Sequence, residues 1–295
     1  CTRHLPVVSR PIVLYGCVAL RHCTGVRSMM IEAFHEVGKD LTSVEEQKVW
    51  LLQNKRTNDW GSTRATVAAC HALLLTGSEL LSEPGSISLK VGGENVPIPE
   101  DQTAGTGQFQ VHWEGSEITP ELAEVQIKRK SKSLAFGGMF WQYFEQLDKI
   151  TPAETPLSLQ KSLWKQVNTD RGPELQVISE EAPLKAGDKL TVRIELRVDR
   201  SMEYVHLKDM RAAGLEPIEV LSRYRYEGGL GFYQSTKDAA THFFMDRLPK
   251  GTYVLEYDLR VSLPGDFSNG ITTLQCMYAP EFSSHSAGAR IQIVE

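Results

Sequence analysis

The chain has 295 residues, of which 41% are hydrophobic, and it carries a formal net charge of −5 with acidic and basic residues intermixed. A chain of this length can form two or three domains with apolar cores. A surface that follows a phosphate backbone needs a clustered basic excess, so the composition argues against nucleic-acid binding. The one basic run, Lys128–Lys132, has no interleaved aromatic residues and is interpreted as a solvated strand end.

The first 25 residues show no clean periodicity. Their longest apolar run, Pro11–Leu20, is about half as long as a membrane span. The box that ends at Cys17 departs from a lipoprotein cleavage signal, because Tyr15 stands where a small residue is required. We expect the chain to be a piece of a longer protein, with a cloning or gene-model boundary as its first residue.

The five cysteines have wide, irregular spacing, and no pair has the C-x-x-C spacing of a metal or redox centre. This pattern excludes a dense disulfide framework and leaves room for one incidental bridge. It does not decide the cellular compartment. The cysteines are Cys1, Cys17, Cys23, Cys70 and Cys276.

Residues 1–82 are predicted to be helical, with residues 1–25 the uncertain part. Apolar residues recur at helical spacing in Val26–Lys39, Thr42–Lys55 and Trp60–Gly77. In the second of these, Ser43 and Glu46 have the spacing of a capping box. In the third, Ser62 is the predicted N-cap and small alanines on one face predict close helix packing. Three helices alone make a poor core, so this is part of a larger helical domain.

Residues 83–173 are predicted to form a β-domain, because the apolar period changes from 3.6 to 2 after Ser82–Gly85. A hairpin is expected around Gly92-Gly93. Further strands are predicted in QFQVHW, AEVQIKRK, GMFWQYFEQ and SLWKQV.

Residues 174–295 are predicted to form an antiparallel β-sandwich. Apolar residues alternate with polar ones in Lys189–Val198, Gly251–Ser262 and Ala289–Val294, and turn signals separate these segments. The segment Tyr224–Gln234 is rich in tyrosine and glycine and is predicted to be a surface loop. Tyr224, Tyr226 and Tyr233 are its candidate partner-binding residues.

Residues that resemble catalytic or metal-binding groups occur near the C-terminus. A hydrolase built on Cys276 or Ser284 would need His242 or His285 within hydrogen-bonding distance, and no G-x-S-x-G elbow is present. Asp238 and His242 are four residues apart, but the surrounding ATHFFMD is typical of a strand, which favours a structural histidine. We predict no catalytic residue, no cofactor and no metal site, and therefore no enzyme.

Three segments carry a family resemblance. They are WLLQNKRTNDWGSTRATVAACHALL, LAFGGMFWQYFEQLDKITPAETPLSLQKSLW, and the pair YVHLKDMRAAGLEPI and DFSNGITTLQCMYAPEFSSHSAG. In this order they resemble the C-terminal part of bacterial, Bacteroides-type, alpha-2-macroglobulin family proteins, over about residues 26–295. The resemblance implies a multidomain α and β chain. Its parts would be a remnant of an α/α toroid (the thioester-type helical domain), a CUB-like β-domain and a final macroglobulin-like sandwich.

The resemblance implies a broad-spectrum endopeptidase inhibitor that traps proteases by conformational change. Family members with a thioester form it within a C-x-E-Q motif, which this chain does not contain. The implied partners are endopeptidases, met by the full-length parent, and a peptidoglycan-synthesising penicillin-binding protein. The implied location is the periplasm or outer cell envelope, with a lipoprotein parent as one option.

Tyr278 lies in MYAPE, which is similar to the family's M-Y-x-P-E motif. The resemblance gives Tyr278 the role of packing over a thioester and excluding water, which suits an aromatic ring with a hydroxyl group. The alternative is that Tyr278 packs on its own sandwich. An alternative function also remains open. The chain would then be a non-catalytic binding module of a cell-envelope protein that docks a protein or glycan partner through residues 224–234.

Overall fold

The computed structural model describes residues 23–75, 87–97, 109–129, 137–153, 155, 157–179 and 182–295. The predictions made for residues 1–22 lie outside this set. The chain divides into two compact units between residues 136 and 137, with Asn54–Asp59 grouped with the second unit. Each unit is therefore described by itself.

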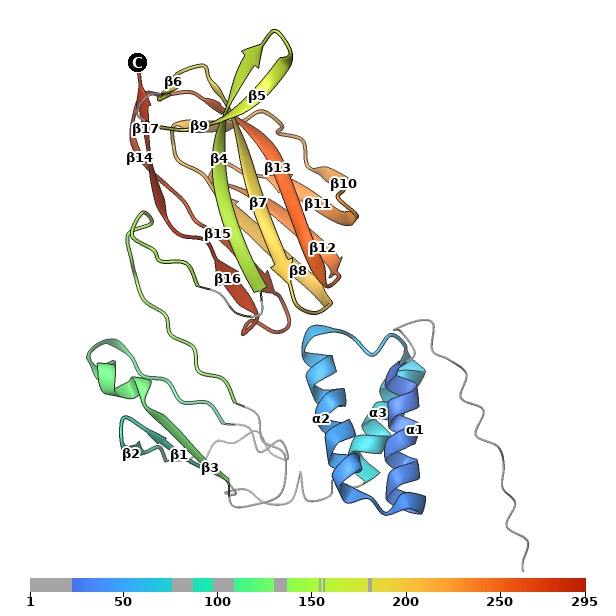
Figure 1. Ribbon diagram of the computed structural model, residues 1–295. Coiled ribbons are helices and arrows are strands. Elements are labelled where there is room, and N and C mark those ends of the chain that lie inside the picture. Colours follow the sequence, from blue (N-terminus) through green and yellow to red (C-terminus); the bar gives the residue numbers. More distant parts are fainter. Residues whose placement is uncertain are drawn as a thin grey trace, which may run out of the picture. The chain divides into compact units, whose positions relative to one another are not determined.

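The first unit begins with helices (Figure 1). They are α1 (Cys23–Ala33), which continues into the π-helical turn η2 (Phe34–Gly38), α2 (Leu41–Thr57) and α3 (Thr63–Leu75). These elements match the three predicted helices. Their buried apolar residues are Ile31, Val44, Leu51, Trp60, Ala69 and Ala72. In the described part of the chain, no helix is long and apolar enough to cross a membrane.

The helix starts show one confirmed cap and one correction. The Ser62 hydroxyl accepts a hydrogen bond from the Ala65 N–H at 3.2 Å, as an N-cap does. In α2 the cap is Asp40, whose carboxylate accepts hydrogen bonds from the Ser43 N–H at 3.2 Å and the Ser43 hydroxyl at 2.6 Å. The predicted capping residue Ser43 lies inside the helix, because a carboxylate one residue before the helix already satisfies the free N–H groups.

The first unit also contains a three-stranded antiparallel sheet of order β2-β1-β3. Its strands are β1 (Ile87–Val91), β2 (Glu94–Asn95) and β3 (Val125–Arg129), and two 3-10 turns, η4 (Gly115–Glu117) and η5 (Pro120–Ala123), precede β3. The predicted turn is present, since Gly92 and Gly93 have φ values of 60° and 82°.

Two predicted strands of the middle region are absent. Residues 109–113 and, in the second unit, residues 138–146 form no ladder in the structure. Alternation of apolar residues indicates a strand only where a partner strand is available. In the second of these segments Phe140, Trp141 and Tyr143 are exposed.

The second unit is a β-sandwich (Figure 1). A six-stranded sheet has the order β10-β11-β12-β8-β15-β16, a five-stranded sheet the order β5-β4-β7-β13-β9, and a small third sheet the order β14-β17-β6. The strands are β4 (Leu157–Thr169), β5 (Gly172–Val177), β6 (Leu184–Lys185), β7 (Lys189–Val198), β8 (Met202–Met210), β9 (Leu215–Pro217), β10 (Arg223–Glu227), β11 (Leu230–Thr236), β12 (Ala240–Leu248), β13 (Gly251–Val261), β14 (Gly265–Asn269), β15 (Thr272–Cys276), β16 (Ser283–His285) and β17 (Ala289–Val294).

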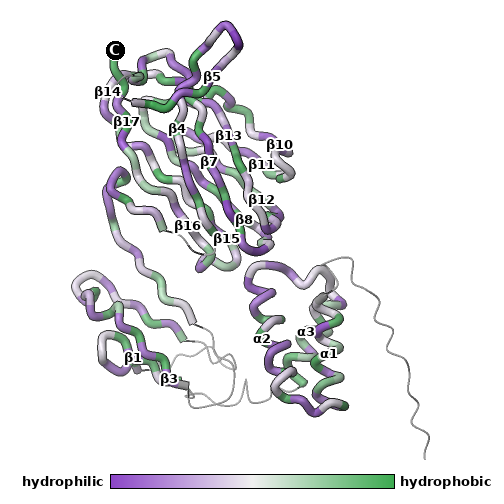
Figure 2. Tube along the Cα trace, viewed as in Figure 1, coloured by the Kyte–Doolittle hydropathy of each residue, from purple (hydrophilic) through white to green (hydrophobic). Residues whose placement is uncertain are grey.

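The core of the sandwich follows the predicted alternation. The alternate residues of β7, from Leu190 to Val198, are buried, as are Leu255, Tyr257 and Leu259 of β13. Figure 2 shows hydrophobic and hydrophilic segments alternating along these strands. Because side chains on a strand alternate between its two faces, one face of each sheet forms the core and the other faces outward.

The sandwich begins earlier than predicted. Strand β4 pairs antiparallel with β7 over ten residues, from Leu157 opposite Val198 to Gln166 opposite Lys189. It therefore belongs to the five-stranded sheet and not to the region assigned to 83–173. We move the boundary from 173/174 to a point before Leu157. The sequence alone places the boundary near Pro173, because pairing between distant segments leaves no local signal.

The segment just before β4 is bound to the end of the chain. We call residues 147–153 the strap. The strap contacts β16, β17 and the residues between them at three points, namely Ala153–His285 (backbone hydrogen bonds of 3.2 and 3.0 Å), Ile150–Gly288 (2.8 Å) and Asp148–Arg290 (an ion pair of 3.2 Å). A glycine is required at 288, because a Cβ there would lie 1.9 Å from the carbonyl oxygen of Leu147.

Candidate functional site: an aromatic face on the six-stranded sheet

The outer face of the six-stranded sheet carries a row of aromatic side chains. Leu207, Phe243 and Leu274 are buried in the core, so the residues next to them in each strand point outward. The pairing register places six outward residues in one line across the sheet, in the order Tyr224, Tyr233, Phe244, His206, Gln275 and Ser283. Four of the six positions are aromatic or histidine.

Much of this row is accessible to solvent. Tyr224 is 77% exposed and Phe244 is 42% exposed, and Tyr226, two residues from Tyr224 on the same side of β10, is also 77% exposed. The rings of Tyr224 and Tyr233 pack edge to face, with centroids 4.9 Å apart. The outer face of an antiparallel sheet is normally polar, whereas aromatic side chains are enriched where proteins dock. The row is therefore a candidate docking surface.

The predicted surface loop at 224–234 is a regular hairpin. Strands β10 and β11 pair from Arg223 to Glu227, and the connecting residues Gly228 and Gly229 have φ values of 56° and 81°. Both central residues of a tight hairpin turn need positive φ, which glycine adopts without strain. The hairpin holds the three candidate tyrosines on defined strand positions.

A histidine pair lies at the centre of the face. The Nε2 atom of His206 and the Nδ1 atom of His242 are 2.9 Å apart, and the two ring planes differ by 1°. The ring of Phe244 is stacked on that of His206, with centroids 4.6 Å apart. When both histidines are neutral, one N–H bridges the two nitrogen atoms. This pairing gives His242 a structural partner on the neighbouring strand.

Burial and nearby positive charge disfavour protonation of this pair. The pKa of His206 is lowered from 6.5, first by burial and then by the charges of His242 and Lys208. The pKa of His242 is lowered as well, first by burial and then by Lys208 and Lys237. The folded protein therefore keeps the pair neutral to a lower pH than the unfolded chain does.

This difference predicts a pH dependence of stability. Above the unfolded pKa of about 6.5 the two histidines are neutral in both the folded and the unfolded protein, and the pair makes its full contribution to the free energy of unfolding. As the pH falls, the unfolded chain binds protons that the folded pair resists, so the free energy of unfolding decreases until the pH is below the folded pKa. Urea denaturation near pH ~7.5 and ~5 should show a larger loss for the parent chain than for His206→Gln/His242→Gln. Equal losses would contradict the prediction.

Tyr278 lies beside the same face, in the turn that follows β15. The Met277 N–H donates a hydrogen bond to the Tyr204 carbonyl at 2.9 Å, and the Cys276 N–H donates one to the Phe282 carbonyl at 3.0 Å. The rings of Tyr278 and Tyr204 pack edge to face, with centroids 5.2 Å apart. Tyr278 is nevertheless 78% exposed. The ring of Tyr278 thus contacts Tyr204 of its own sandwich and is otherwise uncovered.

The two sets of candidate residues thus share one surface, which we call the aromatic face. No local sequence pattern links Tyr278 to the tyrosines of 224–234 or to the residues that lie between them on the sheet. The aromatic face comprises Tyr204, His206, Tyr224, Tyr226, Tyr233, His242, Phe244 and Tyr278.

The candidate nucleophiles and bases are held apart in separate contacts. The buried Ser284 hydroxyl donates to the Leu157 carbonyl, and the adjacent His285 points to the opposite face of β16 because strand neighbours alternate. The Cys276 thiol donates to the Glu203 carbonyl at 3.4 Å, and burial raises the pKa of this thiol. These contacts give no nucleophile–base pair. Within the described residues, no three His, Cys, Asp or Glu side chains gather as a metal ion would require.

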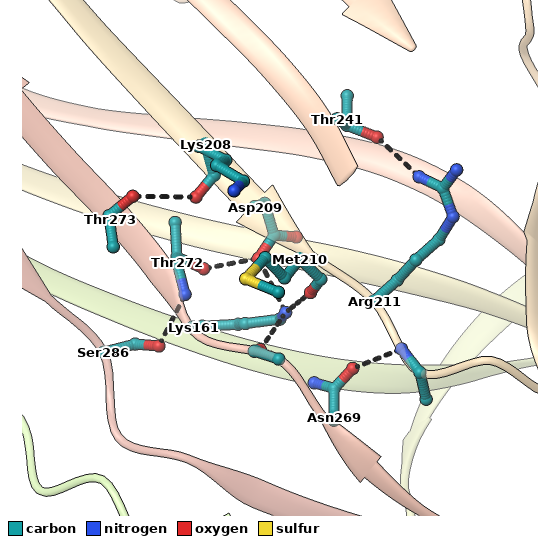
Figure 3. A network of polar contacts seen from close by, with 12 residues as sticks. Lys161, Lys208, Asp209, Met210, Arg211, Thr241, Asn269, Thr272, Thr273 and Ser286 are labelled. Atoms are coloured by element: carbon teal, nitrogen blue, oxygen red, sulfur yellow. Dashed lines mark hydrogen bonds and ion pairs between the residues drawn. The ribbon is translucent and has the colours of Figure 1, made fainter. Parts of the chain in front are cut away.

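A buried polar network between the two large sheets was not predicted. The Nζ atom of Lys161 on β4 lies 2.6 Å from Oδ1 of Asp209 on β8, and the two side chains are 6% and 0% exposed. Lys161 also donates to the carbonyls of Met210 at 2.7 Å and Gly270 at 3.1 Å (Figure 3). These three acceptors, on β8 and next to β15, fix the Lys161 side chain between the sheets, so the network is a structural link.

Hydroxyl groups complete this network around Asp209. The Thr272 hydroxyl donates to Asp209 at 2.5 Å, and the Tyr257 hydroxyl of β13 donates to its other oxygen. Burial and the Asp209 charge raise the pKa of Tyr257 well above its usual value, so the phenol stays protonated. A sequence signal was present, since Lys161 and Asp209 interrupt runs of inward apolar positions in their strands.

Comparison with known families decides what this sandwich is. Residues 157–281 match the family model of the bacterial alpha-2-macroglobulin MG10 domain. The sandwich is a bacterial alpha-2-macroglobulin MG10 domain. The resemblance to this family is thereby confirmed, and the match begins at the first residue of β4.

Solved alpha-2-macroglobulin structures also align with the chain that carries this MG10 domain. A Salmonella tyrosine-to-glycine mutant aligns at 13% identity and a TM-score of 0.39, covering 92% of this chain and 17% of that one. The Escherichia coli protein activated by porcine elastase aligns at 14% identity and a TM-score of 0.46, covering 92% of this chain and 24% of the Escherichia coli chain. A fragment of the Escherichia coli protein from domain MG7 to the C-terminus aligns at 13% identity and a TM-score of 0.38. This alignment covers 95% of this chain and 42% of the fragment. No curated protein sequence matches the chain.

The chain therefore spans between 17% and 42% of these alpha-2-macroglobulin chains. Its MG10 domain is mostly β, as predicted.

Proposed function

We propose that this chain is the C-terminal part of a bacterial alpha-2-macroglobulin-type endopeptidase inhibitor. In this proposal α1–α3 are the remnant of the thioester-type α/α toroid, and β1–β3 belong to a CUB-like domain that ends before the MG10 domain. The chain contributes contacts between domains and conformational change, without a bond-making group of its own. The parent acts in the periplasm or outer cell envelope and meets endopeptidases there.

Two observations support this proposal. The MG10 match covers residues 157–281, which is most of the sandwich, and structures of Escherichia coli relatives are described as activated by porcine elastase and by trypsin. A trapped protease is excluded from large substrates but remains accessible to small ones. We therefore expect the full-length parent to block cleavage of a protein substrate by trypsin while leaving cleavage of a short peptide substrate largely intact. Equal inhibition of both substrates would contradict a trap.

The exposed ring of Tyr278 is the observation that carries the site assignment. Hydrogen bonds at Cys276 and Met277 fix the turn, and contact with Tyr204 orients the ring, yet 78% of Tyr278 remains uncovered. An oriented aromatic side chain without a cover is suited to shield a group on another domain from water. We assign Tyr278 to the thioester of the parent, where the parent carries one.

Methylamine, a small nucleophile that opens a thioester, tests this assignment in the full-length parent. Tyr278→Gly should speed methylamine inactivation about tenfold, because water and amine gain access to the thioester. Tyr278→Phe retains the ring and should react at nearly the parent rate, as should Tyr226→Ser, which removes an equally exposed tyrosine. An unchanged rate in Tyr278→Gly would remove Tyr278 from the mechanism.

A second candidate function is a non-catalytic binding module of the cell envelope. The exposed Tyr224 and Tyr226, with Tyr233 packed against the first of them, favour it. Tyrosine provides a large, rigid contact area with a polar end, as binding surfaces require. The partner would be a protein, such as a peptidoglycan-synthesising penicillin-binding protein, or a glycan. The two functions are compatible within one parent.

A further inference from the structure

The aromatic face is flanked by positive charge along one side. The strand register places Ser235, His242, Lys208, Thr273 and His285 in a second line, next to the aromatic row. Lys237 lies in the turn between β11 and β12, at the end of the same region. This line contains lysine and histidine but no carboxylate.

Lys208 and Lys237 are not neutralised within the sandwich. Neither Lys208 nor Lys237 forms an ion pair with a described residue, whereas Arg223 and Arg225 of β10 are both paired with Glu219. The positive charges of Lys208 and Lys237 also contribute, after burial, to lowering the pKa of His242. The two lysines are therefore available to form ion pairs with a negatively charged partner.

The face also offers hydrogen-bond donors above an apolar platform. The hydroxyls of Tyr224 and Tyr226 lie on exposed side chains, and the neutral His206–His242 pair, stacked with the ring of Phe244, has one ring N–H besides the bridging one. Carboxylates accept such bonds, and aromatic or aliphatic side chains of the same partner would pack on the rings. Tyrosine-rich surfaces of this kind are typical of protein interfaces.

We propose that the aromatic face binds an acidic polypeptide segment, whose carboxylates meet Lys208 and Lys237 and whose apolar side chains pack on Phe244, Tyr233 and Tyr224. This proposal rests on the second candidate function and names its partner class. Two lysines are too few to track a polyanionic backbone, so the charge is matched to a few carboxylates set among apolar groups. Aromatic anchors supply the affinity and the lysines supply the orientation.

The test uses the purified chain and a fluorescent random copolymer of glutamate and tyrosine as the probe. Binding should be measurable at low ionic strength and weaken as salt is added. Lys208→Glu and Lys237→Glu should each weaken it about fivefold. Phe244→Ser should weaken it about tenfold, because the stacked platform is lost. Circular dichroism of each variant checks that the sandwich is intact.

Lys250→Glu is the matched control, since it makes the same change of net charge in the turn after β12, at the other end of that strand from Lys237. It should leave binding unchanged. Equal weakening by Lys250→Glu and Lys208→Glu would overturn the proposal, because the effect would then be one of net charge.

Heparin, an anionic polysaccharide, is the competing probe. If heparin binds more tightly than the copolymer, the partner is a glycan, and the acidic-polypeptide proposal fails while the binding-module function stands. If neither probe binds, both fail. The trapping and methylamine experiments on the parent are unaffected by either outcome, so failure of the inhibitor proposal remains distinguishable.

Discussion

Replacing Lys161 by alanine should lower the free energy of unfolding of the MG10 domain by about 3–5 kcal/mol. The change leaves the Asp209 carboxylate fully buried and without its counter-ion, and it removes the donor to the carbonyls of Met210 and Gly270. A buried charge without a partner is far costlier than a lost surface contact. Urea denaturation of the purified chain, followed by circular dichroism, measures the effect.

Lys165 on the same strand provides a matched control. It forms an ion pair of 2.6 Å with Asp188, but these side chains are 16% and 24% exposed, so water can solvate Asp188 when the lysine is removed. Lys165→Ala should therefore cost no more than about 1 kcal/mol. The double variant Lys161→Met/Asp209→Leu should recover much of the loss, because no charge is then left buried. Equal losses for Lys161→Ala and Lys165→Ala would show that burial does not govern the Lys161–Asp209 pair.

Gly270→Ala should also destabilise the MG10 domain, by about 3 kcal/mol. A Cβ at 270 would lie 2.2 Å from the Cβ of Met210 and 3.2 Å from its carbonyl carbon. Either the backbone at 210 or that at 270 must move, and both carbonyls are acceptors for Lys161. The added methyl group should therefore overpack the core and also displace the carbonyl groups that bind Lys161.

Gly231→Ala is the comparison for this variant. A Cβ at 231 would meet only the ring of Tyr226, at 3.6 Å, which is an ordinary contact. We expect a change within about 0.5 kcal/mol, as for other surface substitutions. Hydrogen exchange at the Met210 amide, which bonds to the Ile271 carbonyl at 3.1 Å, should accelerate in Gly270→Ala and not in Gly231→Ala. Unchanged exchange at Met210 would show that the chain accommodates the added methyl elsewhere.

The strands with regular alternation could be predicted from the sequence because the signal is local. In β7, β13 and β17 the inward residues occupy every second position, so one alternating pattern predicts both the strand and its buried face. The helices were predictable for the same reason. The cap of α2 differs from the prediction because Ser43 and Glu46 have the spacing of a capping box, whereas Asp40, three residues before Ser43, accepts the hydrogen bond of the first turn.

The features that the sequence does not predict are those that depend on which strands become neighbours in the sheets. The membership of β4 in the sandwich rests on pairing with β7, about thirty residues away, and no local pattern records such pairing. The aromatic face was missed as a unit for the same reason. Tyr224 and His206 are aligned only because β11 and β12 lie between their strands. The Lys161–Asp209 pair left a local trace, a charge at an inward position, that could have been found.

The strap has a practical consequence for anyone who produces this domain. The family match starts at residue 157, which suggests a fragment beginning there. Such a fragment would lack residues 147–153, so the backbone groups of His285 and Gly288 would lose their partners and Arg290 would lose Asp148. The edge of β16 would then be bare, and bare strand edges promote aggregation. An expression boundary upstream of the strap, near residue 146, keeps that edge covered.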